Sequence, residues 1–311
     1  MLNRKSNLTV ARNFLQLIRF PNLIIIALSM YLIRLMLVEP ILILSHEAPS
    51  VTSFNFFLMT LATVLIAAGG YIINDIEDRK IDQINKRKNP ILLQTISKDT
   101  AYNLYLGISF IGICIGFYLT FKTQMHLVAY INLISAGLLY FYSTTYKKQF
   151  LIGNIIISLL TALSIALPYL TEPIAPSIES LKLLATGYVS FAFLLSMTRE
   201  IIKDMEDIKG DAAAGCKTLP VVTGITISKV VTSTIIIIIL LLLIIIQVAS
   251  HQWEAIIPFL YVAVLIEVPL VILLVSVFIS STEVDFKRCS ILSKLIMVSG
   301  IFSIPVFFYS L

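Results

Sequence analysis

The sequence predicts an all-α integral membrane protein, a bundle of about nine transmembrane helices with a cytoplasmic N-terminus and an external C-terminus. The 311 residues are 58% hydrophobic and only 13% charged, and the mean hydropathy is +0.94. A soluble domain normally carries about a quarter charged residues, so this chain has too little polar surface to cover a globule in water. Long apolar runs recur along it, and the basic residues gather in alternate connections between them.

Nine apolar runs are long enough to cross a bilayer, which takes about 20 residues of helix. The first run follows a basic segment, but it is too long for the apolar part of a signal peptide and lacks a small-residue cleavage site, so we expect it to be retained. Only a few residues around Lys122 separate the third and fourth runs, which predicts a tight hairpin. The runs fall near residues 22–44, 53–73, 102–121, 126–144, 151–170, 180–200, 227–249, 255–281 and 289–310.

The distribution of lysine and arginine predicts the orientation of these spans. With the N-terminus in the cytoplasm, all but three of the 23 basic residues fall on the cytoplasmic side, the exceptions being Arg34, Lys122 and Lys182. Arg34 is expected to extend to the external surface. No separate soluble segment stands out, so residues 1–311 are expected to form one domain, placed in the cytoplasmic (inner) membrane of the cell.

The two longest polar connections, residues 74–100 and 203–226, both fall on the predicted cytoplasmic side and each contains a cluster of aspartates. The spacing i, i+3 and i+7 is the same in both clusters, and on a helix these positions share one face over two turns. The clusters hold six of the eight aspartates in the protein: Asp75, Asp78, Asp82, Asp204, Asp207 and Asp211.

Three carboxylates on one helical face repel one another, and the repulsion grows at the edge of a bilayer, so the arrangement favours binding of a cation. The three cysteines and three histidines are scattered, which excludes a disulfide framework and a histidine-based metal site. Oxygen ligands favour a hard ion, magnesium (Mg2+) first. A calcium loop is disfavoured because the EF-hand order of ligands and its closing Glu are absent. The alternative is that the aspartates only keep the helix ends hydrated, and the repeated spacing argues against it.

Basic residues are interleaved with both clusters and could complete the neutralisation of a diphosphate held between two metal-loaded clusters. The alternative is that they only follow the positive-inside rule. The residues expected to bind diphosphate are Arg79, Lys80, Lys86, Lys147, Arg199 and Lys203.

The first cluster, Asn74-Asp75-x-x-Asp78-x-x-x-Asp82, resembles the first signature of the UbiA-type intramembrane prenyltransferases, and Asp204-x-x-Asp207-x-x-x-Asp211 resembles their second. The resemblance covers nearly the whole chain, because that family has nine transmembrane helices with both motifs on the cytoplasmic side. Two further segments are similar to family landmarks, and they mark Asn22 and Tyr142 as substrate-pocket residues: Arg19-Phe20-Pro21-Asn22 and Tyr142-Ser143.

The stretch from Arg199 to Asp207, followed by Gly210-Asp211, is most similar to the branch of the family that makes archaeal-type ether lipids, the geranylgeranylglycerol-phosphate geranylgeranyltransferases. There is one departure. After Asp82 that branch usually reads Asn-Arg-Pro-x-Arg-Pro, whereas this chain reads Asn-Lys-Arg-Lys-Asn-Pro over residues 85–90, which keeps the positive charge but loses the first proline.

The resemblance implies Mg2+-dependent transfer of a polyprenyl group, geranylgeranyl on this likeness, from its diphosphate to a membrane acceptor. That acceptor would be the hydroxyl of geranylgeranylglyceryl phosphate. Catalysis would depend on stabilising the charge of the departing diphosphate. The implied catalytic residues are Asp78, Asp82, Asp207 and Asp211. The implied metal ligands are these four with Asn74, and with Asp75 and Asp204 as ligands or direct supports.

Two alternatives stay open. One is an enzyme of the same family with an aromatic acceptor, in quinone or haem biosynthesis. The other is a membrane transporter, which predicts ionisable residues and broken helices within the spans. The acidic residues cluster at the ends of the spans and only Glu267 falls deep within one, which favours the enzyme.

Overall fold

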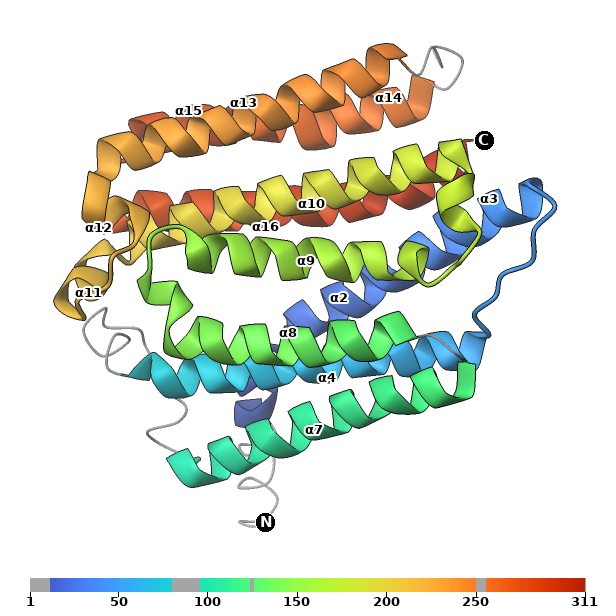
Figure 1. Cartoon of the computed structure of the whole chain (residues 1–311). Coiled ribbons are helices and arrows are strands. Elements are labelled where there is room, and N and C mark those ends of the chain that lie inside the picture. The colour runs from blue at the N-terminus through green and yellow to red at the C-terminus, as the bar shows by residue number, and fades with distance from the viewer. Residues whose placement is uncertain (1–11, 80–95, 124–125, 250–255, 311) are drawn as a thin grey trace, which may run out of the picture. The chain divides into compact units, whose positions relative to one another are not determined.

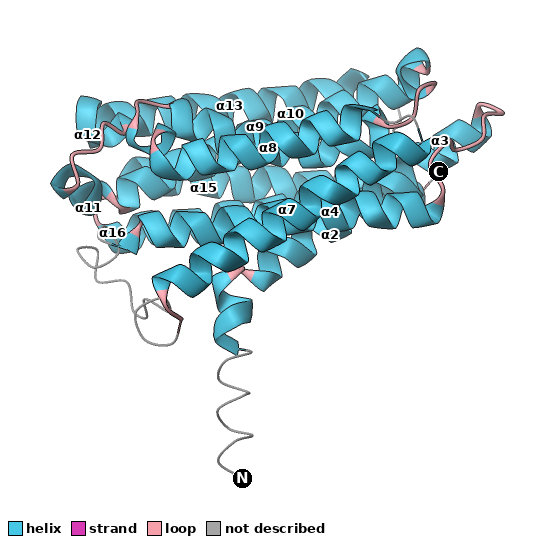
Figure 2. Cartoon of the chain, turned by 60° about the horizontal axis from the view of Figure 1, so that its bottom comes forward, coloured by secondary structure: helices cyan, strands magenta, loops and turns pink. Residues whose placement is uncertain are grey.

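The computed structural model describes residues 12–79, 96–123, 126–249 and 256–310, which form helices joined by loops and contain no strand (Figure 2). Within these residues nine helical segments are long and apolar enough to cross a membrane, which confirms the predicted class of multi-pass, all-α membrane protein. The segments are Phe20–Leu44, Ser53–Glu77, Lys98–Thr123, His126–Thr144, Ile152–Leu170, Glu179–Glu206, Ile225–Val248, Ile256–Ile279 and Glu283–Phe308.

Several of these helices extend beyond the apolar runs that predicted them, among them the second, the sixth and the ninth. The second continues to Glu77 and the sixth to Glu206, whereas their apolar runs end near residues 73 and 200. The ninth begins at Glu283, where Thr282 and Asp285 form reciprocal side-chain caps. Apolar runs mark the thickness of the bilayer, and backbone hydrogen bonding continues past it. The extra turns of the second and sixth helices carry polar residues of the candidate site.

The described chain groups into two compact units. Unit 1 contains residues 1–28, 51–148 and 213–215, and unit 2 contains residues 29–50, 149–212 and 216–311. The single domain expected from the sequence stays a prediction.

Unit 1 contains the start of α2 (Phe20–Ile33), three long helices and a short 3-10 turn, η2 (Tyr146–Lys148). The long helices α4 (Ser53–Glu77), α7 (Lys98–Thr123) and α8 (His126–Thr144) lie side by side (Figure 1). Small residues let helices approach closely in lipid, where the hydrophobic effect does not drive them together. A Cβ added at Gly112 of α7 would lie 3.1 Å from the carbonyl oxygen of Ala62 in α4.

An apolar cluster at the end of unit 1 positions the first aspartate motif. Ile72, Ile73 and Ile76 of α4 are buried in it together with Leu17 and Tyr105. Because these three isoleucines take up the packed face of the helix, the polar residues between them are left partly accessible.

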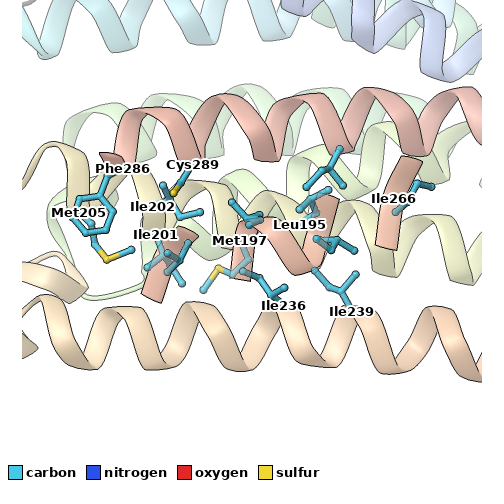
Figure 3. Packing of buried hydrophobic residues seen from close by; sticks show 14 of the residues in the cluster. Leu195, Met197, Ile201, Ile202, Met205, Ile236, Ile239, Ile266, Phe286 and Cys289 are labelled. Carbon is cyan, nitrogen blue, oxygen red and sulfur yellow. The ribbon is translucent and has the colours of Figure 1, made fainter. Parts of the chain in front are cut away.

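Unit 2 is organised around α10, which packs against α9, α13 and α16. Figure 3 shows Leu195, Ile201, Ile202 and Met205 of α10 buried among residues of α13 and α16. Three neighbouring helices therefore hold the end of α10 that carries the second aspartate motif. The helices of this unit are α3 (Glu39–Leu44), α9 (Ile152–Leu170), α10 (Glu179–Glu206), α11 (Ile208–Ala213), α12 (Leu219–Thr223), α13 (Ile225–Ala249), α14 (Ile256–Val262), α15 (Val268–Ile279) and α16 (Glu283–Phe308), with a 3-10 turn, η3 (Ala175–Ser177).

Two spans of unit 2 contain a π-helical turn: η1 (Arg34–Val38) and η4 (Ala263–Glu267). A proline follows each turn within two residues, Pro40 and Pro269. Proline has no N–H to donate to the carbonyl one turn earlier, so these sites favour a widened turn.

Both turns hold intramembrane ionisable residues that have partners. The expectation that Arg34 extends to the external surface is wrong. Arg34 is only 5% exposed, and its Nε donates a hydrogen bond to Glu39 Oε1 at 2.6 Å. A carboxylate in the same span neutralises the guanidinium, so it has no need to reach water. Glu267 accepts a hydrogen bond from Gln247 Nε2 at 2.8 Å, which fits a structural role.

Candidate functional site

The first aspartate motif straddles the end of α4. Asn74 lies in the last helical turn with Asp75, and Asp78 caps the helix by donating its backbone N–H to the Asn74 carbonyl. The Asn74 side chain returns a hydrogen bond, from Nδ2 to Asp78 Oδ2, at 2.8 Å. These three predicted ligands therefore lie together. Lys80, Asp82 and Lys86 lie outside the described residues, and Arg79 is exposed directly before them.

Each described carboxylate of this motif has a cation from a distant segment. Arg19 Nη2 lies 2.7 Å from Asp75 Oδ1, and Lys147 Nζ pairs with Asp78 Oδ1. Lys147 was predicted from the sequence to bind diphosphate, and in the structure it lies at the first aspartate motif. The pairing of Arg19 was missed, because Arg19 was noted only as part of a family landmark.

Of the two predicted pocket residues, Asn22 lies in the same segment as Arg19, and Tyr142 lies on α8. The Arg19 guanidinium lies over the Tyr71 ring, 4.9 Å from its centre, and the Asn22 amide donates to the Tyr71 hydroxyl at 3.4 Å. Burial alone would lower the pKa of Arg19, but the charge of Asp75 and the contributions of Tyr71 and Tyr142 outweigh it and raise the pKa above its usual value. Asn22 and Tyr142 therefore both lie close to this part of unit 1.

The second motif does not form one continuous helical face, so that expectation is wrong. Helix α10 ends at Glu206, Asp207 leaves the helical conformation, and Asp211 belongs to the separate short helix α11. Backbone hydrogen bonds from Asp207 N to Lys203 O and from Asp211 N to Asp207 O span the break. The chain therefore changes direction at Asp207 without losing these two backbone hydrogen bonds.

Asp204 is held by a residue that sequence reasoning missed. Asn154 of α9, which is 6% exposed, donates from Nδ2 to Asp204 Oδ2 at 2.7 Å. The only signal in the sequence was an amide side chain near the start of an apolar run. Asp211 accepts a longer hydrogen bond, 3.4 Å, from the hydroxyl of Thr218.

The two predicted diphosphate ligands of unit 2 lie beside Glu200, which is 8% exposed and was not predicted. Arg199 Nη1 is 2.9 Å from Glu200 Oε1, and Lys203 Nζ is 3.8 Å from Glu200 Oε2. The Nε of Arg199 is buried and has no hydrogen-bond partner among the described residues. Arg199 thus retains a donor suited to an anion.

The donor set of both motifs consists of carboxylate and amide oxygens, the ligands that Mg2+ prefers. Within the described part of the chain, no three acidic, histidine or cysteine side chains converge on one point. In unit 1 the reason is visible, since Asp75 and Asp78 are turned towards Arg19 and Lys147. The chemistry of the residues therefore fits magnesium.

The multi-pass helical fold and the two aspartate motifs are the features expected of the UbiA class of membrane proteins. Residues 35–296 match the UbiA prenyltransferase family, and the chain belongs to that family. The resemblance inferred from the two aspartate motifs is therefore confirmed.

Relatives and solved structures agree with this assignment. The chain is 36% identical over 187 residues to the digeranylgeranylglyceryl phosphate synthase of Thermococcus sibiricus, covering 60% of this chain and 61% of the relative. It therefore spans about three-fifths of the length of the curated relatives it matches. A solved structure of a digeranylgeranylglyceryl phosphate synthase superposes with a TM-score of 0.64 at 21% identity, covering 94% of this chain and 98% of that one. A UbiA homolog from Archaeoglobus fulgidus, bound to GPP and Mg2+, gives a TM-score of 0.58 at 18% identity, covering 94% and 99%.

Proposed function

We propose that this protein transfers a geranylgeranyl group from its diphosphate to the hydroxyl of geranylgeranylglyceryl phosphate, with Mg2+ as cofactor. We place it in the cytoplasmic membrane, with its N-terminus and both motifs on the cytoplasmic side. The observation that carries the proposal is that each aspartate motif lies at the end of a membrane-spanning helix beside fixed cations. The name shared by the curated relatives, digeranylgeranylglyceryl phosphate synthase, supports this donor and acceptor.

In this proposal the aspartates hold the metal and the basic residues meet the phosphate oxygens. Mg2+, when bound, would neutralise the charge that builds on the departing diphosphate. The proposed metal ligands are Asn74, Asp75, Asp78, Asp82, Asp204, Asp207 and Asp211. The proposed diphosphate ligands are Arg79, Lys80, Lys86, Lys147, Arg199 and Lys203.

The bond changes balance without a redox partner. The allylic C–O bond breaks and the diphosphate leaves with its electron pair. The acceptor oxygen forms a new ether bond to the same carbon, and the hydroxyl proton passes to the departing diphosphate or to water. Asn22 and Tyr142 are proposed to line the pocket for the reacting end of the donor. The buried Nε of Arg199 supports a role in holding the diphosphate, because a donor in that position gains most from a charged acceptor.

The test is incubation of membranes containing the protein with radiolabelled geranylgeranyl diphosphate, Mg2+ and a panel of acceptors. We expect a labelled ether lipid when geranylgeranylglyceryl phosphate is supplied. Label appearing only in an aromatic acid or a quinol would overturn the proposed acceptor. No transfer to any acceptor by folded protein would overturn the activity.

The matched variants are Asp78→Ala and Asp207→Ala, one in each motif, with Asp99→Ala as the control. Asp99 is an exposed aspartate in the first turn of α7, outside both motifs. We expect each motif variant to lose turnover while remaining folded, and the Asp99 variant to keep it. Full activity in either motif variant would remove the metal site from the proposal.

A further inference from the structure

Both described carboxylates of the first motif are paired with cations that lie outside the motif. Asp75 pairs with Arg19, 56 residues earlier in the chain, and Asp78 pairs with Lys147, 69 residues later. Two separate segments of unit 1 therefore each bring one cation to one carboxylate.

The Arg19 and Asp75 side chains are 34% and 25% exposed, whereas the Lys147–Asp78 pair is more buried than an ordinary surface ion pair, which contributes little. The Lys147 side chain is 10% exposed and that of Asp78 is 17% exposed. Arg19 is held over the Tyr71 ring, and its backbone takes a left-handed conformation (φ 49°) that few non-glycine residues adopt. Asn22 N–H donates to the Arg19 carbonyl at 2.8 Å, which fixes this turn at the start of α2.

A carboxylate oxygen 2.7 Å from a guanidinium cannot also coordinate a divalent ion without strong repulsion between the two cations. Building on the proposed function, we infer that Arg19 and Lys147 are internal counter-cations of the first motif. They occupy Asp75 and Asp78 until a divalent metal displaces them, and they thereby weaken the affinity of the motif for metal. Arg19 is thus a positioning residue, which controls when its aspartate is available.

The pairing of Arg19 with Asp75 and of Lys147 with Asp78 stabilises the ionised form of both carboxylates. Without metal, two carboxylates at the edge of a bilayer would repel each other and be costly to keep ionised. The two cations remove that cost. Once displaced, they stay tethered beside the motif, where the negative charge of a diphosphate can take the place of the aspartates.

The test measures metal binding directly, by titrating the purified full-length protein in detergent with Mn2+ and following free Mn2+ by electron paramagnetic resonance. We expect Arg19→Gln and Lys147→Gln each to bind Mn2+ about five- to tenfold more tightly than the wild type, the lower end of the range found for coupled binding events. Arg19→Lys keeps the charge and should stay near the wild-type affinity.

The controls remove the same charge nearby. Arg12 and Lys148 are exposed neighbours of the two cations along the chain, and Arg12→Gln and Lys148→Gln should leave Mn2+ affinity unchanged. Equal tightening in the control and test variants would reduce the effect to net charge and overturn the inference.

The remaining outcomes separate this inference from the proposed function. Unchanged or weaker Mn2+ binding in both Arg19→Gln and Lys147→Gln, with normal binding by the wild type, overturns the counter-cation role alone. A folding defect cannot mimic the expected result, because it would weaken binding. A folded wild-type protein that binds no Mn2+ would overturn the metal site, and the inference with it.

Discussion

Asn154 holds Asp204 through a 2.7 Å hydrogen bond between their side chains, although the two residues lie 50 positions apart on neighbouring helices. Helix α9 carries no aspartate of either motif, yet it positions one of the predicted metal ligands. Outer residues of this kind orient a ligand and adjust its basicity. The packing of α9 against α10 is therefore part of the site.

Replacing Asn154 with Ala should reduce prenyl transfer by about ten- to a hundredfold, the usual effect of losing a residue that orients a metal ligand. The measurement is turnover at saturating Mg2+, together with a thermal melt to confirm folding. Ser158→Ala is the matched control, since Ser158 lies one turn along the same helix, is fully buried and donates to the Asn154 carbonyl. Equal losses in the two variants would mean that packing of α9, and not the bond to Asp204, is responsible.

Removing divalent metal should abolish the reaction. We expect chelation to lower turnover by more than about a hundredfold, as when a principal stabiliser of transition-state charge is lost. Added Mg2+ should restore it. Ca2+, which is larger and takes more ligands, should restore far less. Activity that survives exhaustive chelation would count against the oxygen-ligand site.

Gly112→Ala should destabilise unit 1. The added Cβ would lie 2.9 Å from Ile66 Cγ1 and 3.1 Å from the Ala62 carbonyl oxygen, and backbone cannot move aside as a side chain can. Overpacking of this kind costs about 1–3 kcal/mol. Gly107→Ala, on the same helix with open space around the new Cβ, should be neutral or slightly stabilising. Thermal melts in matched detergent compare the two, and similar melting temperatures would contradict the close approach of α4 and α7.

Glu39→Ala should destabilise the protein by about 3–5 kcal/mol, because it removes the carboxylate that pairs with the buried Arg34 guanidinium at 2.6 Å. The double variant Arg34→Met with Glu39→Leu removes both charges and should recover most of that loss. Chemical or thermal unfolding of the three proteins gives the comparison. A double variant no more stable than Glu39→Ala would show that Arg34 has a further structural role.

The spans and the two motifs could be predicted because their signals are local. An apolar run of sufficient length defines a span by itself, and the repeated aspartate spacing is visible within eight residues. The ends of the helices were predicted less accurately, because the turns that follow residues 73 and 200 are polar but still helical.

The residues that hold the aspartates, Arg19 and Asn154, could not be predicted because their roles depend on contacts between segments far apart in the sequence. No residue next to Arg19 in the sequence predicts its ion pair with Asp75. Asn154 is one polar residue in an apolar run, and nothing near it predicts its hydrogen bond to Asp204. The break at Asp207 was also hidden, because neither proline nor glycine occupies that position. The predicted external position of Arg34 was wrong because Arg34 forms an ion pair with Glu39, which lies in the same span.

The left-handed backbone of Arg19 has a consequence for protein engineering. Holding a non-glycine residue in that conformation costs about 1–2 kcal/mol, and a glycine there would relieve it. Glycine at position 19 would therefore relieve backbone strain but also remove the ion pair with Asp75, so the two effects on melting temperature oppose each other. Such a variant would lack the guanidinium that faces Asp75. Screens for stability in this protein need a metal-dose response beside the melting curve, because a substitution at this residue changes the backbone strain, the ion pair with Asp75 and the metal affinity together.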